Sequence, residues 1–130
     1  MHEFKLKLAF VDDCVFQQMM MEMLLKRMKV FHLSFTCNDG SELIERLDDS
    51  SELPEICIID LHMPNMGGIK TAHEISARFP EIKVFGYTDS KDQDEIDDFK
   101  RNGVVHVFSK TNPISMLGQI NTLLNPLLTR

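Results

Sequence analysis

The sequence predicts an α/β fold in which five parallel strands form one sheet and helices cover both of its faces. Short apolar runs rich in Val, Ile and Phe recur at regular intervals, which is typical of buried strands. Segments with helical spacing separate these runs. Strands joined by helices of about ten residues run parallel through right-handed crossovers, so the helices fall on both sides of the sheet. We therefore expect a doubly wound (βα)5 sandwich.

The predicted elements alternate strictly along the chain. The strands are expected at 6–11, 30–35, 56–59, 82–87 and 104–108, and the helices at 15–28, 41–47, 69–79, 92–101 and 114–124. Turn residues support this division, because they precede the second and third helices and close the fourth. These are Asn38-Asp39-Gly40, Met63-Pro64-Asn65, Gly67-Gly68 and Gly103.

Methionines crowd the first predicted helix, where they occupy Met19, Met20, Met21, Met23 and Met28. We expect a helix this apolar to pack on one side and to stay adaptable on the other, because the Met side chain is flexible. Two interpretations remain open. The methionines fill the core, or some of them form a docking face.

Length and composition indicate one globular domain that spans residues 1–130. The 14 Lys and Arg residues against 20 Asp and Glu give a net charge of -6, which argues against direct nucleic-acid binding. Cys14, Cys37 and Cys57 are odd in number and widely spaced, so neither a disulfide framework nor a zinc site is expected. A cytoplasmic protein fits best, since we find no secretion signal and no apolar run long enough to span a membrane.

Polar side chains gather at the carboxyl ends of the predicted strands. Asp12 and Asp13 follow the first strand, Asp60 the third, Thr88 the fourth and Lys110 the fifth. Ligands of doubly wound sheets bind at this edge, in the crevice where strand order reverses. Three neighbouring carboxylates raise each other's pKa values, and proteins usually offset this cost with a cation. Oxygen ligands without Cys or His favour Mg²⁺ or Mn²⁺.

Such a site is suited to phosphoryl chemistry. A carboxylate can attack phosphorus, while a Lys and a hydroxyl stabilise the transferring group. Taken singly, Asp12-Asp13 is equally well explained as a helix cap, Thr88 as a strand-end hydroxyl and Lys110 as a solvated cation. Their order on successive strands favours one shared site.

The ordered set of these residues resembles the signature of two-component response-regulator receivers of the chemotaxis-regulator type. The set consists of Asp12-Asp13, the run Asp60-Leu61-His62-Met63-Pro64-Asn65-Met66-Gly67-Gly68, Thr88 and Lys110. The resemblance implies a flavodoxin-like strand order 2-1-3-4-5. It also implies that Asp60 accepts a phosphoryl group from the phosphohistidine of a sensor histidine kinase or phosphotransfer protein.

The resemblance further implies the ligands of the metal ion and the parts of the switch. Asp12, Asp13, Asp60 and the backbone carbonyl of His62 would hold Mg²⁺ or Mn²⁺. Lys110 would pair with the phosphoryl oxygens, and Thr88 would turn its hydroxyl toward them. This movement would shift the loop and helix after the fourth strand. His62 should border the phosphoryl pocket.

The sequence departs from the family pattern at several positions. Asp89 stands where a small residue usually follows the Thr, and its carboxylate should oppose a phosphoryl dianion unless it turns outward. Val107 replaces the usual aromatic, and Phe108 beside it should face the opposite side of the sheet. In the family a Pro usually follows the Lys directly, but here Thr111 and Asn112 lie between Lys110 and Pro113. Gly67 stands at a position where the family commonly has Asp or Asn.

The main alternative is a receiver-like interaction module that takes no phosphoryl group. An Asp-nucleophile phosphohydrolase fits less well, because the candidate nucleophile follows the third strand and not the first, and a flavin carrier lacks its phosphate loop. We therefore expect a signalling domain and not an enzyme. Residues 126–130 leave no room for an output domain, so we expect a stand-alone receiver or a piece of a longer regulator. By family analogy alone, a homodimer could form through the last strand and last two helices.

Overall fold

Five strands and five helices alternate along residues 5–125, the part of the chain that the computed structural model describes. The strands are β1 (Leu6–Val11), β2 (Phe31–Cys37), β3 (Ile56–Asp60), β4 (Lys83–Thr88) and β5 (Val104–Ser109). The helices are α1 (Val15–Arg27), α2 (Gly40–Asp49), α3 (Gly68–Arg78), α4 (Gln93–Arg101) and α5 (Pro113–Leu124). Every predicted strand and helix is present in the predicted order.

The element boundaries differ most from the prediction in β2 and α2. β2 continues to Cys37 because Thr36 and Cys37 pair with Phe10 and Val11 of β1. α2 continues through two exposed acidic residues to Asp49. A helix is predicted from the regular spacing of its apolar residues, and polar residues on its solvent side do not contribute to that spacing. The predicted helix therefore ends before the observed one.

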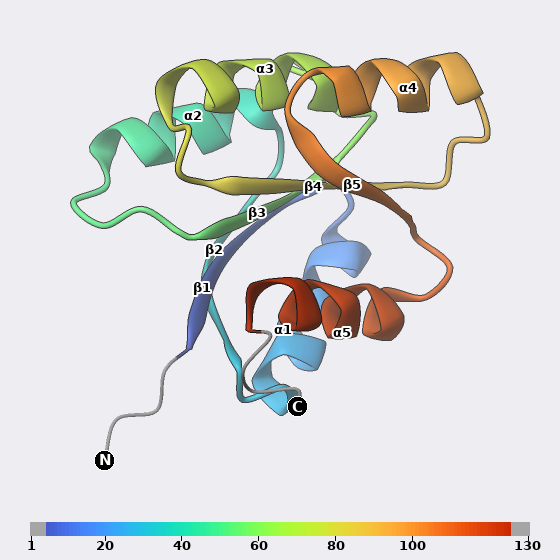
Figure 1. Ribbon diagram of the computed structural model, residues 1–130. Coiled ribbons are helices and arrows are strands. Elements are labelled where there is room, and N and C mark those ends of the chain that lie inside the picture. The colour runs from blue at the N-terminus through green and yellow to red at the C-terminus, as the bar shows by residue number, and fades with distance from the viewer. Residues whose placement is uncertain (1–4, 126–130) are drawn as a thin grey trace.

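The strands form one parallel sheet in the order β2-β1-β3-β4-β5, which confirms the predicted topology. Helices α1 and α5 cover one face, and α2, α3 and α4 cover the other (Figure 1). The strand order reverses between β1 and β3, because β2 and β3 lie on opposite sides of β1. A crevice is expected beyond the carboxyl ends of β1 and β3.

A hydrophobic cluster lies on each face of the sheet. Ile59 and Phe99 belong to the cluster beneath α2, α3 and α4, whereas Phe10 and Tyr87 belong to the cluster beneath α1 and α5. β3 is buried along its whole length, as expected of a central strand. Val107 packs against the first cluster and Phe108 belongs to the second, which confirms that these neighbours face opposite sides.

Helix α1 buries only a narrow stripe. Met21 and Leu25 are its buried residues, while Phe16, Met19 and Met23 are exposed. Core filling therefore explains Met21 but not Met19 or Met23. The other interpretation, a docking face, stays a prediction.

Residues 1–4 and 126–130 lie outside the described residues, so the expectations about the chain's N-terminal sequence and about the space after α5 concern segments not described. Within residues 5–125, no helix combines the length and the apolar character needed to cross a bilayer.

Candidate functional site

The sheet brings the predicted site residues to one edge. Val11 pairs with Ile59, so Asp12 and Asp60 emerge side by side from β1 and β3. The Asp12 backbone N–H donates to the carbonyl of Cys37 at 3.1 Å and fixes the end of β1 against β2. The unshifted parallel register of β1 and β3 thus places these two acids next to each other.

Helix α3 begins unusually close to the end of β3. A Cβ atom on Gly68 would lie 2.4 Å from the Asp60 carbonyl oxygen and 2.8 Å from the Leu61 Cα. The Gly68 backbone N–H also donates to the Leu61 carbonyl at 2.9 Å. Only glycine allows this approach, so Gly68 helps to fix the position of Asp60.

Three carboxylates meet at this edge. Oxygen atoms of Asp12, Asp13 and Asp60 all lie within 4.8 Å of one another. Asp12 is fully buried and Asp60 is 6% exposed, whereas Asp13 is open to solvent. Asp12 Oδ1 accepts from the Cys14 backbone N–H at 2.9 Å, so its orientation is fixed. The structure confirms that these predicted acids are neighbours.

Lys110 lies between the two buried carboxylates. Its Nζ is 3.0 Å from Asp12 Oδ2, 3.2 Å from Asp60 Oδ2 and 5.4 Å from the ring centre of Tyr87. Burial acts to lower the pKa of Lys110, but its hydrogen bonds to Asp12 and Asp60 and their charges outweigh this, and the pKa is raised. The ammonium is therefore held in its charged form by both acids.

The electrostatics of Asp60 show that one ammonium does not balance the cluster. Burial, followed by the charge of Asp12, raises the pKa of Asp60 from 3.8 to about 6. Lys110 and a hydrogen bond from the His62 backbone N–H act in the opposite direction but do not cancel the rise. An additional cation at this position would remove the remaining excess of negative charge.

The donor set fits a hard divalent cation. Three carboxylates from the carboxyl ends of β1 and β3 converge on one point, and no Cys or His ligand atom belongs to the group. Mg²⁺ prefers oxygen ligands and keeps several waters when carboxylates bind it. The acidic cluster can therefore accommodate Mg²⁺ or Mn²⁺ on chemical grounds.

Thr88 and the His62 side chain belong to a second network. Thr88 is buried, and its Oγ1 accepts from the Ser90 backbone N–H at 3.0 Å. Ser90 Oγ donates to Glu95 Oε1 at 3.1 Å, and Glu95 Oε2 lies 2.6 Å from His62 Nε2. Sequence reasoning missed Ser90 and Glu95, because Ser90 does not belong to a recognisable motif and Glu95 lies within a helix, away from the strand ends.

Gln18 was also missed, although it supports the acidic cluster. Its side-chain amide donates to the Asp12 carbonyl at 2.6 Å, to the Cys37 carbonyl at 3.4 Å and to Asn38 Oδ1 at 3.0 Å. The first turn of α1 thereby ties the ends of β1 and β2 together. No sequence signal marks a Gln that acts through backbone carbonyls.

Asp89 turns outward, so its carboxylate does not oppose a phosphoryl dianion in the way that an inward-facing acid would. Its side chain is exposed, and its charge is not among those that shift the pKa of Asp60. The sequence-based expectation that it hinders phosphoryl transfer therefore loses its premise.

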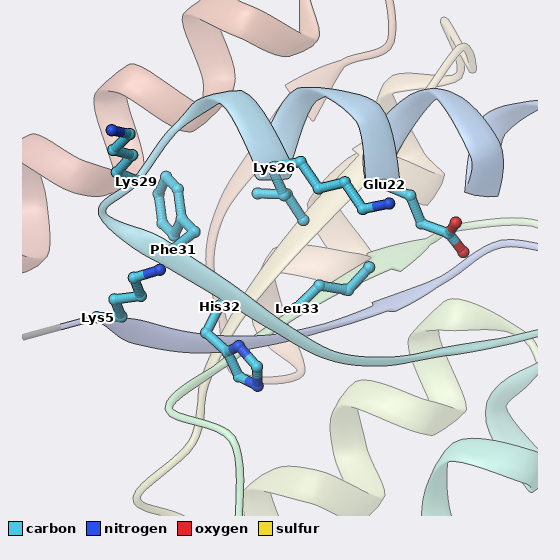
Figure 2. Close-up of a pocket in the computed structure, with 8 residues that line it drawn as sticks. Lys5, Glu22, Lys26, Lys29, Phe31, His32 and Leu33 are labelled. Atoms are coloured by element: carbon cyan, nitrogen blue, oxygen red, sulfur yellow. The ribbon is translucent and has the colours of Figure 1, made fainter.

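A separate cavity of about 380 Å³ lies at the opposite end of the sheet (Figure 2). It contains none of the predicted site residues. Residues near the amino ends of β1 and β2 and the end of α1, Leu25 among them, surround the cavity. Figure 2 shows how Lys5, Glu22, Lys26, Lys29, Phe31, His32 and Leu33 lie around it. It is therefore distinct from the acidic cluster.

Comparison with known proteins places the chain among signalling domains. Residues 8–121 match the response regulator receiver domain family. The chemotaxis protein CheY of Listeria monocytogenes is 32% identical over 79 residues, which cover 61% of this chain and 64% of CheY. The transcriptional regulatory protein CitT of Halalkalibacterium halodurans is 20% identical over 104 residues, or 80% of this chain and 45% of CitT. The chain thus spans about half to two thirds of the length of these relatives.

Solved structures show the same fold. The CheY-like receiver protein of Methanospirillum hungatei superimposes with a TM-score of 0.83 at 17% identity, over 95% of this chain and 96% of that one. The phosphorylated cyanobacterial phytochrome response regulator RcpA gives a TM-score of 0.80 at 22% identity, over 94% and 96%. Because the family match extends over most of its length, the chain belongs to the response regulator receiver domain family of two-component signalling.

Proposed function

We propose that Asp60 accepts a phosphoryl group from the phosphohistidine of a sensor histidine kinase or phosphotransfer protein, in a reaction that requires Mg²⁺ or Mn²⁺. The observation that carries the proposal is the convergence of Asp12, Asp13, Asp60 and Lys110 at the carboxyl ends of three parallel strands. We also propose that residues 1–130 form a single receiver domain.

The transfer replaces a P–N bond with a P–O bond. A carboxylate oxygen of Asp60 attacks phosphorus, the bond to the donor imidazole breaks, and the imidazole keeps its electron pair. The product is an aspartyl phosphate, and nothing is oxidised or reduced. With a pKa of about 6, Asp60 is mostly ionised at neutral pH, and its burial leaves the carboxylate poorly solvated and reactive.

Asp12, Asp13 and Asp60, with the backbone carbonyl of His62, are the residues that would hold the cation. When bound, it supplies positive charge next to the transferring phosphoryl group. The two neighbouring acids have different surroundings: Asp12 is buried and fixed by Cys14 and Lys110, whereas Asp13 is exposed. We infer that Asp12 orients the site and that Asp13 completes it when the cation arrives.

Lys110 and Thr88 would bind the phosphoryl oxygens. Lys110 already contacts Asp60, so only a small shift of its ammonium is needed. Thr88 needs a larger change, because its hydroxyl now accepts from Ser90. The loop between β4 and α4 follows Thr88, and the output is a shift in the populations of two positions of this loop and of α4.

The partner of this segment is a protein and not nucleic acid. The net charge of -6 opposes contact with phosphate backbones. One solved structure with this fold is of RcsB dimers bound to DNA, but this sequence covers only 61% of that RcsB chain. We assign no DNA contact to the receiver segment.

The proposal is tested by intact-protein mass spectrometry after incubation with acetyl phosphate, with and without Mg²⁺. Wild type should gain one phosphoryl group only with Mg²⁺, and Asp60→Asn should gain none. Asp49→Asn is the matched control, because Asp49 is an exposed acid at the end of α2, and it should behave like wild type. If wild type gains nothing in either buffer, the non-phosphorylated interaction module becomes the better interpretation.

A further inference from the structure

We propose that Glu95 is a positioning residue that clamps the β3–α3 loop to the β4–α4 loop in the unphosphorylated protein. In this inference, release of Glu95 accompanies phosphorylation of Asp60 and frees α4 to move. The inference rests on the function proposed above, and it identifies a connection between Asp60 and α4 that does not require an aromatic side chain at Val107.

The clamp consists of the two oxygens of a single carboxylate. Glu95 Oε2 lies 2.6 Å from His62 Nε2 in the β3–α3 loop, and Glu95 Oε1 accepts from Ser90 Oγ at 3.1 Å in the β4–α4 loop. Glu95 itself lies in the first turn of α4, where its backbone N–H donates to the capping side chain of Asp92. A well-anchored helix start thus holds two loops at once.

Each loop connects Glu95 with a residue of the proposed phosphoryl site. On one side, His62 lies two residues after Asp60, and its backbone N–H acts to lower the pKa of the Asp60 carboxyl. On the other side, the Ser90 backbone N–H donates to Thr88 Oγ1 at 3.0 Å. A series of contacts therefore runs from His62, two residues after Asp60, through Glu95 and Ser90 to Thr88.

The clamp opposes the movement that Thr88 must make. Turning the Thr88 hydroxyl toward a phosphoryl group on Asp60 breaks its contact with the Ser90 N–H, and Ser90 cannot follow while its hydroxyl is bound to Glu95. A phosphoryl group adds acceptor oxygens and negative charge that attract the Thr88 hydroxyl. The contact between Ser90 and Glu95 must then loosen, and the first turn of α4 is released.

The structure also provides space for the loop to move. A cavity of about 220 Å³ lies between the β4–α4 loop and β5, and both Thr88 and Ser90 line it. Val107 lines the same cavity, and a larger side chain at this position would occupy part of it. The loop can therefore move inward without displacing the core.

Partly exposed ion pairs and hydrogen bonds of this kind change an equilibrium by about two- to fivefold. We therefore expect Glu95→Ala to increase the rate of phosphorylation by acetyl phosphate about two- to fivefold. Glu95→Gln keeps an amide oxygen that can accept from Ser90 Oγ and loses only the carboxylate oxygen that contacts His62 Nε2, so its increase should be smaller. Asp94→Ala is the matched control, because it removes an exposed acid from the same turn of α4.

The test combines this rate with amide NMR of the unphosphorylated variants. In Glu95→Ala, the Ser90 amide signal should move toward its position in wild type saturated with beryllofluoride, whereas in Asp94→Ala it should stay in place. Equal rates for both variants, or a Ser90 signal that moves in another direction, would overturn the clamp. If wild type itself takes no phosphoryl group, the proposed function fails and the clamp falls with it, so the two failures are distinguishable.

Discussion

Replacing the buried Asp60 with Asn should stabilise the metal-free protein at neutral pH. The pKa of Asp60 rises from 3.8 in its ordinary state to about 6 in the folded protein, mainly through burial and the charge of Asp12. Each pKa unit corresponds to about 1.4 kcal/mol, so ionised Asp60 lowers the free energy of unfolding by roughly 3 kcal/mol. Asn has a similar shape but no charge, and Asp60→Asn avoids this cost.

The cost has a defined pH dependence. The folded state holds the Asp60 proton more tightly than the unfolded chain does, so the unfolded chain loses this proton first as pH rises from about 4. The contribution of Asp60 to the free energy of unfolding therefore falls between about pH 4 and pH 6 and stays low above pH 6. The advantage of Asp60→Asn over wild type should be close to zero at pH 4 and near its maximum at pH 7.5.

Urea unfolding of both proteins, followed by circular dichroism in buffers with EDTA, measures this difference. The difference between the two proteins isolates Asp60, because all other titrating groups are shared. An Asp60→Asn variant that is equally or less stable than wild type at pH 7.5 would refute the reasoning. A difference that stays constant from pH 4 to pH 7.5 would refute it too.

Three further perturbations address the same edge of the sheet. Adding Mg²⁺ should raise the unfolding temperature of wild type through binding to the folded state, and Asp13→Asn should lose most of this rise, as thermal unfolding with and without EDTA would show. Lys110→Met should lower the free energy of unfolding at pH 7.5 by about 2–4 kcal/mol, because it leaves Asp12 and Asp60 without their cation, and urea titration would measure this. Asp89→Ala should change the rate of phosphorylation less than twofold, since its exposed carboxylate does not act on Asp60, and a larger change in that rate would show that Asp89 turns inward.

The fold could be predicted because burial leaves a clear pattern in the central strands. β3 is buried at every position, so its apolar run is unbroken up to Asp60. A carboxylate at the end of such a strand is conspicuous, and the order of the strands places it beside Asp12. The acidic cluster therefore follows from local sequence together with the topology of a parallel sheet.

Contacts that depend on tertiary placement could not be predicted in the same way. Glu95 is one of several acids in α4, and nothing in its spacing indicates that it reaches His62 from another loop. Helix α1 is apolar on more than one side, so its sequence did not show that Met21 faces the core while Met19 faces solvent. The outward direction of Asp89 likewise depends on the path of its loop.

The central claim is that Asp60 carries the phosphoryl group. The most direct measurement is reduction of the phosphorylated protein with borohydride, which converts an aspartyl phosphate to homoserine, followed by peptide sequencing by tandem mass spectrometry. The account predicts homoserine at position 60 after incubation with acetyl phosphate and Mg²⁺, and none when Mg²⁺ is left out. Homoserine at another acid such as Asp12 or Asp13, or none under any condition, would contradict it.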